Sequence, residues 1–442
     1  MLKKMREKLD SISGNHPLVL KVAKFNIALS SATFAGKVLT FLVMIPVARI
    51  LGPAAYGAYS ALVSYAGILL SLINVGFKEV LAIETSRDQR LLPEYLSKTF
   101  TLTAYLSAIL FVASTIAVIF YHEAMFRVPA EIASNFSLLA ILYSACILYF
   151  GPSNVFTRVF QVKQKEFHNA FSVFLERAVF AVGVVVLFYG NAVGGIKALV
   201  LSYLLSTLAV SLYWAYWAFK WTKMRLEPYP DWGFAKRLFP KAKWFAASAI
   251  IAGVMGQIST FLTQSLSSTT QAGYFFTAYG LVVVALLMVT NAYWTTTVVA
   301  AKKTTRKFFL ALAQRLALLV ALAVAASLAA SLVSGQLILF LYKKDFLPAA
   351  GILNILVFLL PLSLISLWGD QMLMSTGNQK RQVYILMLAL FVNLAASILF
   401  IPVGGAMGAA AAMLLSQVVA TAATTIAGYS IYSKMKPGTI YR

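Results

Sequence analysis

The sequence predicts an all-α polytopic membrane protein with about 12 transmembrane helices in two six-helix lobes. Of its 442 residues, 60% are hydrophobic and only 12% are charged, whereas soluble domains carry about 25% charged residues. Long apolar stretches recur along the whole chain, and lysines and arginines gather in alternate connections between them. Short sequence patterns also recur at about half the chain length. Together these observations indicate a membrane protein built from a duplicated unit.

The apolar stretches define the individual spans. A membrane-spanning helix needs roughly 20 apolar residues. Division at charge clusters and turn residues gives the candidates 22–50, 55–77, 97–121, 133–157, 167–189, 195–219, 242–266, 271–299, 308–334, 347–376, 382–402 and 406–432. The eighth and tenth candidates are long, so we expect them to be tilted.

The distribution of basic residues predicts the orientation. One set of connections holds Lys78, Arg87, Arg90, Lys98, Arg158, Lys163, Lys165, Lys302, Lys303, Arg306, Lys307, Lys380, Arg381, Lys434, Lys436 and Arg442. The opposite set holds few: Arg127, Lys343 and Lys344. By the positive-inside rule, we expect a multi-pass protein of the cytoplasmic (inner) membrane with both termini in the cytoplasm. The net charge of +23 then reflects topology, and no nucleic-acid partner is expected.

Internal similarity predicts the domain organisation. The pattern Val193-Gly194-Gly195 recurs 210 residues later as Val403-Gly404-Gly405, and Ala23-Lys24-Phe25 recurs as Ala242-Lys243-Trp244. We expect an N-terminal lobe at 1–222, a cytoplasmic inter-lobe linker at 223–241 on the anionic headgroups, and a C-terminal lobe at 242–442. Repeats of six helices share one orientation, so a pseudo-two-fold axis along the membrane normal relates them. In transporters of this architecture the substrate site lies between the halves.

A polar stripe on the first span points to a cavity. Its members follow spacings of four, three, four and three along one helix face: Asn26, Ser30, Thr33, Lys37 and Thr40. An intramembrane charge is a functional hypothesis by default, so we expect Lys37 to face a cavity or the substrate. The alternative is a structural lysine paired with a buried carboxylate, for which Asp370 is the best candidate.

Polar residues on three further spans extend this hypothesis. Asn74 ends a stripe of small residues on the second span, Gln257 and Gln264 share one face of the seventh, and Asn291 lies on the eighth. Small-residue stripes also mediate close helix packing, and this is the favoured alternative for the second span. For the first and seventh spans we expect a shared cavity between the lobes.

The remaining intramembrane charges leave alternatives open. Glu176 and Arg177 lie together in the fifth span, either in an internal ion-pair network or with Arg177 as a second cavity cation and Glu176 as a candidate ion-coupling group. Arg158, at the cytoplasmic end of the fourth span, is either a topology charge or a cavity residue. Asp370 on the tenth span is either a proton or sodium site or a structural partner.

The sequence argues against an enzyme. It contains no GxxxxGK[ST] nucleotide-binding loop, and no catalytic constellation is apparent. The chain has one cysteine, Cys146, and three histidines far apart in sequence, so no cofactor, metal site or disulfide is expected. Energy for transport must then come from an ion gradient (H+ or Na+), from the gradient of the substrate, or from metabolic consumption of the product.

Several motifs carry a resemblance to a known family. The stretch IPVARILGPAAYGAY at 45–59 resembles the signature that opens polysaccharide-biosynthesis (Wzx-type) flippases. Further similarities lie in LFLY and FLPAA within 339–350, STGNQK at 375–380, Asn393, and IPVGGAMGAA at 401–410. The similarity covers essentially the whole chain, and the first and last motifs are the most specific.

This resemblance implies the fold of the multidrug/oligosaccharidyl-lipid/polysaccharide exporter superfamily, with two lobes in a V around a central cavity. It implies flipping of a polyprenyl-pyrophosphate-linked oligosaccharide to the outer leaflet for surface polysaccharide (O-antigen of lipopolysaccharide, capsule or exopolysaccharide), with membrane lipids, a polymerase and chain-length proteins as candidate partners. Lys37 falls where related lipid II flippases place a cavity arginine, whereas Val43 occupies the position of their second arginine. Two alternatives remain: a gradient-driven multidrug or organic-cation antiporter of the related extrusion family, and a non-transporting scaffold of a polysaccharide assembly complex.

Overall fold

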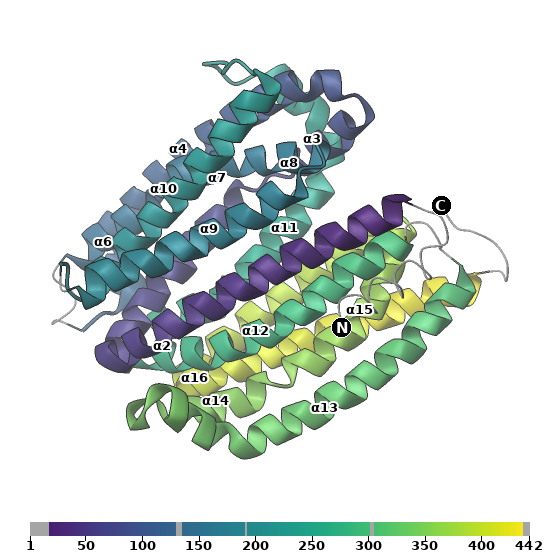
Figure 1. The fold of residues 1–442 in the computed structure, drawn as a ribbon. Coiled ribbons are helices and arrows are strands. Elements are labelled where there is room, and N and C mark those ends of the chain that lie inside the picture. The colour runs from purple at the N-terminus through teal and green to yellow at the C-terminus, as the bar shows by residue number, and fades with distance from the viewer. Residues whose placement is uncertain (1–16, 130–134, 191, 301–304, 436–442) are drawn as a thin grey trace.

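The computed structural model describes residues 17–129, 135–190, 192–300 and 305–435, with side chains described from residue 33 onward except those of 166 and 287–300. The described chain is all-α (Figure 1). Its helices are α2 (Pro17–Ile73), α3 (Phe77–Arg87), α4 (Leu92–Phe126), α6 (Phe136–Ser144), α7 (Ile147–Ser153), α8 (Thr157–Val162), α9 (Glu166–Val184), α10 (Gly195–Thr222), α11 (Trp232–Leu266), α12 (Thr269–Ala300), α13 (Arg306–Tyr342), α14 (Ala349–Leu356), α15 (Leu359–Ser375) and α16 (Gln379–Lys434).

Ten helical segments in the described ranges are long and apolar enough to cross a membrane, fewer than the 12 spans predicted. The difference arises from α2 and α16, of 57 and 56 residues. A straight helix of this length would extend about 85 Å, far beyond the ~30 Å hydrocarbon core. Each instead breaks at one glycine, Gly52 (φ 74°, ψ 171°) and Gly405 (φ 55°, ψ −130°). Lys37 and Tyr59, on either side of Gly52, line the same cavity, so the chain reverses there and α2 supplies two spans.

The duplicated organisation is visible in the backbone. Gly195 (φ 62°) and Gly405 (φ 55°) both adopt the left-handed conformation that favours glycine, and they are the last glycines of the two Val-Gly-Gly patterns. Helical geometry is also interrupted at matching places in the two halves, between α6 and α7 and between α14 and α15.

Two lobes, α2–α10 and α12–α16, meet at one end of the molecule and diverge toward the end that carries α3 (Figure 1). We call these the Pro53 end and the α3 end. At the Pro53 end, Gly57 and Gly273 lie so close to the backbone of the opposite lobe, at Thr269 and Pro53, that neither position has room for a Cβ. Arg49 strengthens the contact by donating from Nε to the Leu341 carbonyl oxygen (2.6 Å).

The segment between the lobes is held in place rather than free. Three hydroxyls spaced four residues apart on α4 donate to its carbonyl oxygens: Ser97 to Arg225 (2.6 Å), Thr101 to Glu227 (2.8 Å) and Tyr105 to Pro228 (3.1 Å). Such spacing puts the three hydroxyls on one face of the helix.

Helix α11 begins inside the predicted linker 223–241. The Asp231 carboxylate caps α11 by accepting from the Phe234 backbone N–H (2.8 Å) and also pairs with Lys98 of α4 (3.0 Å). Apolar residues of the first turns, Phe234 and Leu238, pack with residues of α3 and α4 in one buried cluster. The linker is therefore helical from Trp232 onward, and the start of α11 is fixed to the N-terminal lobe.

Candidate functional site

A cavity of about 260 Å³ lies between the lobes. Both halves of α2, together with α6, α9 and α10, supply its N-terminal wall, while α11, α12 and the end of α13 supply the opposite wall. Its polar residues other than tyrosine are Lys37, Thr40, Arg177, Ser206, Gln257 and Thr260.

Two cations dominate the electrostatics of the cavity. Lys37 projects from α2 and Arg177 from α9, and no carboxylate belongs to the described residues that line the space. The guanidinium of Arg177 lies 3.5 Å from Glu176 Oε1. Two like charges in a low-dielectric space repel each other, so the arrangement favours an anionic ligand.

A second feature of the cavity is its aromatic lining. Six tyrosines contribute: Tyr56, Tyr59, Tyr143, Tyr203, Tyr279 and Tyr342. Tyr143 stacks on Tyr203 with ring centroids 4.5 Å apart, and Tyr59 meets Tyr143 edge-on at 6.3 Å. Tyrosine offers an apolar ring face and a hydroxyl that donates or accepts. The sequence pattern did not reveal these tyrosines. The one available signal is that Tyr56 and Tyr59 lie next to Gly57, a member of the small-residue stripe on the second span.

The cavity brings together Lys37, Arg177 and Gln257, and it also includes Thr40 of the polar stripe. Thr33 is described but does not line the cavity. The side chains of Asn26, Ser30 and Asn291 lie outside the described residues, although the backbone at these positions is helical.

Four other predicted residues lie elsewhere. Asn74 lines a separate pocket at the α3 end. Gln264 is buried beyond the cavity, where its Nε2 donates to the Phe126 carbonyl oxygen. Asp370 of α15 accepts a hydrogen bond from Gln382 (3.3 Å), and among the described residues no ion pair joins it to Lys37. Glu176 is held by the neighbouring Arg177.

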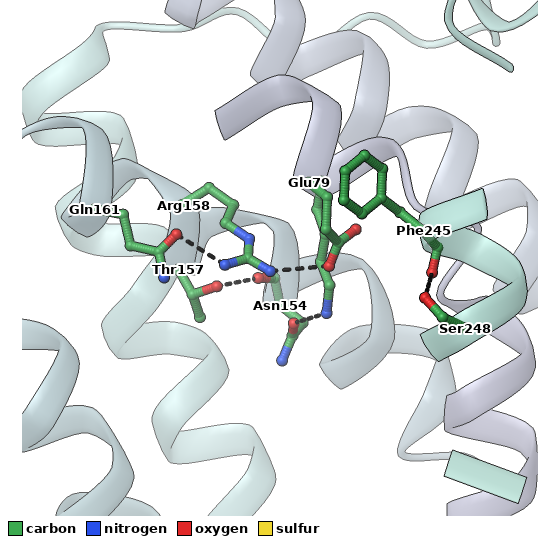
Figure 2. Close-up of polar contacts among 8 residues, drawn as sticks. Glu79, Asn154, Thr157, Arg158, Gln161, Phe245 and Ser248 are labelled. Carbon is green, nitrogen blue, oxygen red and sulfur yellow. Dashed lines mark hydrogen bonds and ion pairs between the residues drawn. The ribbon is translucent and has the colours of Figure 1, made fainter. Parts of the chain in front are cut away.

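Arg158 also lies at the α3 end, on helix α8. It pairs with Glu79 of α3 (2.9 Å) and donates to Gln161 (2.8 Å) (Figure 2). A carboxylate on another element thus neutralises this arginine, which fits the topology-charge alternative and not a place in the cavity.

Among the described residues, no group of three or more His, Cys, Asp or Glu side chains is arranged to hold a metal ion. The cavity offers instead two cations, hydroxyls, amides and aromatic faces, which suits binding rather than covalent catalysis.

A family model described as "Polysaccharide biosynthesis protein" matches residues 22–300, well over half of the chain. The chain belongs to the polysaccharide biosynthesis protein family. No curated sequence matches it.

Solved structures share the fold of this family member. An inward-facing multidrug resistance MATE family transporter of the MOP superfamily aligns with a TM-score of 0.69 and 16% identity, over 92% of this chain and 94% of that one. An outward-facing structure of such a transporter gives 0.63 and 18% identity, over 93% and 96%. A MOP superfamily transporter from Pyrococcus furiosus Vc1, described for the reverse polarity of its binding pocket, gives 0.63 and 16% identity over the same shares.

These similarities show that the chain has a multi-pass, two-lobe membrane fold with the helices arranged as in the aligned MATE structures. The proteins of these aligned structures are described as transporters.

Proposed function

We propose that this member of the family translocates a polyprenyl-pyrophosphate-linked oligosaccharide from the cytoplasmic to the outer leaflet. The observation that carries the proposal is the central cavity with Lys37 and Arg177 on its walls and no carboxylate among its described lining residues. A diphosphate is the anionic part of such a substrate, and cations in a low-dielectric space attract it more strongly than they would in water.

The uncharged residues that line the cavity suit the sugars of the substrate. Sugars present apolar ring faces and many hydroxyls, which suit the tyrosine rings and the amide and hydroxyl groups of Gln257, Thr260 and Ser206. About 260 Å³ is less than a typical pocket for a drug-sized ligand. The cavity would therefore hold the diphosphate and the first sugar, with the remaining sugars in the space between the lobes and the lipid tail in the bilayer.

The conformation supports loading from one side. The lobes touch at the Pro53 end, and the inward-facing MATE structure aligns better than the outward-facing one, with TM-scores of 0.69 and 0.63. With the α3 end in the cytoplasm, as the basic residues suggest, the cavity loads from the cytoplasmic leaflet of the inner membrane, and both termini are cytoplasmic. Rocking of the lobes then opens the Pro53 end.

The proposed product feeds assembly of a surface polysaccharide, such as O-antigen, capsule or exopolysaccharide, with a polymerase and chain-length proteins as partners downstream. Arg158 and Asn74 are not needed in the central site on this account. Glu176 and Asp370 are the candidate groups for coupling to H+ or Na+, since these carboxylates lie within the candidate membrane spans Phe167–Tyr189 and Ala349–Ser375.

The main competing function is export of organic cations, because the aligned structures include multidrug transporters. Two cations without a lining carboxylate would repel such a substrate. A scaffold without transport is the other alternative, and a built cavity between the lobes argues against it.

Reconstitution distinguishes these functions. Proteoliposomes with a fluorescent polyprenyl-diphosphate oligosaccharide in both leaflets should show protein-dependent movement to the leaflet probed by an added quencher. A lipophilic cationic dye should not move faster than in protein-free liposomes. Movement of the dye but not of the glycolipid would establish the antiporter instead, and movement of neither would favour the scaffold.

A further inference from the structure

A second cavity, of about 220 Å³, lies at the α3 end. It is enclosed by the end of α2, the start of α3, α4, α7 and α11. Its polar side chains are Ser71, Asn74, Lys78, Thr103 and Asn154. The proposed function does not use this cavity.

Lys78 is the charged residue that lines this cavity, and it has no carboxylate partner among the described residues. Its ammonium group donates to Asn154 Oδ1 (2.8 Å), and among the described residues no carboxylate lies within ion-pair distance of it. The adjacent Glu79 is already paired with Arg158 (2.9 Å) (Figure 2). An ammonium group has three donors, so two remain for a ligand.

Further donors surround this cation. Asn154 accepts from Lys78 through its oxygen, which leaves its amide NH2 without a hydrogen bond among the described residues. The Asn74 Oδ1 atom is buried without a partner. Exchange of the amide oxygen and nitrogen by rotation of the side chain would place the Asn74 NH2 group, a donor, at that position. The first turn of α3, at Phe77 and Lys78, adds backbone N–H groups at the positive end of the helix.

The second cavity is separate from the central one. Helices α2 and α11 touch between the two cavities. Gly253 packs on Ser71, and a Cβ at Gly67 would lie 2.9 Å from the Gln257 side chain. Ala249 lines the second cavity and Gln257 the central one, and eight helical residues between them correspond to about 12 Å. A ligand in one cavity therefore does not occupy the other.

We propose that the second cavity is an anion site that binds a phosphate or diphosphate group through Lys78, Asn74 and Asn154. A metal cation is disfavoured because Lys78 lies in the wall and Arg158 nearby. A tetrahedral oxyanion offers several acceptors to donors that converge from different helices, and charge-assisted hydrogen bonds are the strong ones. Where the group belongs to a lipid-linked glycan, an assignment that rests on the proposed function, this site holds the diphosphate at the α3 end before it reaches Lys37.

Calorimetric titration with inorganic pyrophosphate tests the site. The protein carries Lys37→Gln and Arg177→Gln, which remove the cations of the central cavity, and is purified in detergent. We expect this background to retain pyrophosphate binding. Lys78→Gln added to it should weaken binding about tenfold or more, and Lys78→Arg should retain most of it.

Two further variants separate binding from folding. Asn154→Asp keeps the size of the side chain but supplies Lys78 with a carboxylate, so it should also weaken binding about tenfold or more. Lys165→Gln removes a lysine that lies over the Trp221 ring, outside either cavity, and should leave binding unchanged. Pyrophosphate affinity that is the same in the background, Lys78→Gln and Asn154→Asp proteins, or no binding to the background, overturns the proposal.

Competition identifies the source of the phosphate group. Displacement of pyrophosphate by polyprenyl diphosphate, but not by phosphatidylglycerol in mixed micelles, assigns the site to the substrate. Displacement by both assigns it to bilayer headgroups as well, and either result supports an anion site. The proposed translocation activity is measured separately in proteoliposomes, so its failure would not be mistaken for failure of this site.

Discussion

Gly36 lies directly against the side chain of Arg177: a Cβ at position 36 would be 2.9 Å from Arg177 Cγ. Lys37 follows Gly36 on the same helix and lines the cavity that Arg177 also lines. The absence of a side chain at position 36 thus lets the arginine of α9 cross α2 and reach the space beside the lysine. A glycine within the span positions the two cations relative to each other.

We therefore predict that Gly36→Ala slows glycolipid translocation several-fold by displacing Arg177, although both cations are retained. Initial rates in proteoliposomes, normalised to inserted protein, measure the effect. Gly335→Ala in α13 is the matched control, because no atom lies within 4 Å of its added Cβ. Equal rates for the two alanine variants would show that the position of Arg177 does not matter.

The close contact at the Pro53 end predicts a conformational shift. In Gly273→Ala the new Cβ would meet the carbonyl group of Pro53 in the other lobe, so the lobes cannot approach as they do here and this end should open. Gly280→Ala lies two turns away on α12, where an added Cβ meets nothing within 4 Å, and should behave as the parent.

Spin labels at Glu123 and Lys344, exposed residues near the Pro53 end of the two lobes, report this opening by pulsed electron resonance. The single native cysteine, Cys146, is buried and should stay unlabelled. The distance distribution should lengthen in Gly273→Ala and not in Gly280→Ala. An unchanged distribution in both would mean that the contact does not limit closure.

The hydroxyls of Ser97 and Thr101 on α4 are expected to protect the linker from proteolysis. Thr101→Val with Ser97→Ala removes three hydrogen bonds to the linker, two to its carbonyl oxygens and one that Ser97 Oγ accepts from the Glu227 N–H. Each contributes about 0.5–1.5 kcal/mol. Trypsin should then cut faster after Lys223 and Arg225. Thr103→Val is the control, since this hydroxyl bonds only to Thr99 of its own helix. Equal cutting rates in the two proteins would contradict the anchoring role.

The burial of Lys78 leads us to expect that the stability of the protein depends on pH. Burial lowers the pKa of Lys78 from 10.5 to about 8 in the folded protein. The Glu79 carboxylate acts to raise this pKa, and Arg158 acts more weakly to lower it. Between these values the unfolded chain binds more protons, so stability rises with pH across the window. The difference in unfolding temperature between the native protein and Lys78→Met should shift in favour of the native protein from pH 8 to pH 10. A constant difference would contradict the buried ammonium.

Much of the fold follows from the sequence because lipid imposes simple rules. Span lengths and the Val-Gly-Gly repeat predicted the all-α, two-lobe arrangement. Gly52, which belongs to the motif at 45–59, lies at the turn between the first two spans. The interruptions in α6–α7 and α14–α15 carry no such signal, since the residues there remain apolar. The helical start of α11 was hidden within a polar stretch whose apolar residues, including Phe234, pack on α3 and α4.

The site was less accessible to sequence reasoning. Lys37 and Gln257 stood out because polar groups are rare in spans, and the structure places both in the central cavity. The tyrosines did not stand out, because aromatic residues are common in apolar segments. The two alternatives for Arg158 stayed open in the sequence because its partner Glu79 is distant along the chain, and only folding brings the two within 2.9 Å.

The charge of Lys37 is the central claim, and charge reversal tests it most directly. Translocation of fluorescent polyprenyl-diphosphate oligosaccharide is compared in proteoliposomes for the native protein, Lys37→Arg and Lys37→Glu, at equal amounts of inserted protein. We predict that Lys37→Arg retains most of the rate, because the positive charge remains, and that Lys37→Glu reduces it at least tenfold. A Lys37→Glu protein that moves the glycolipid at the native rate would contradict the account.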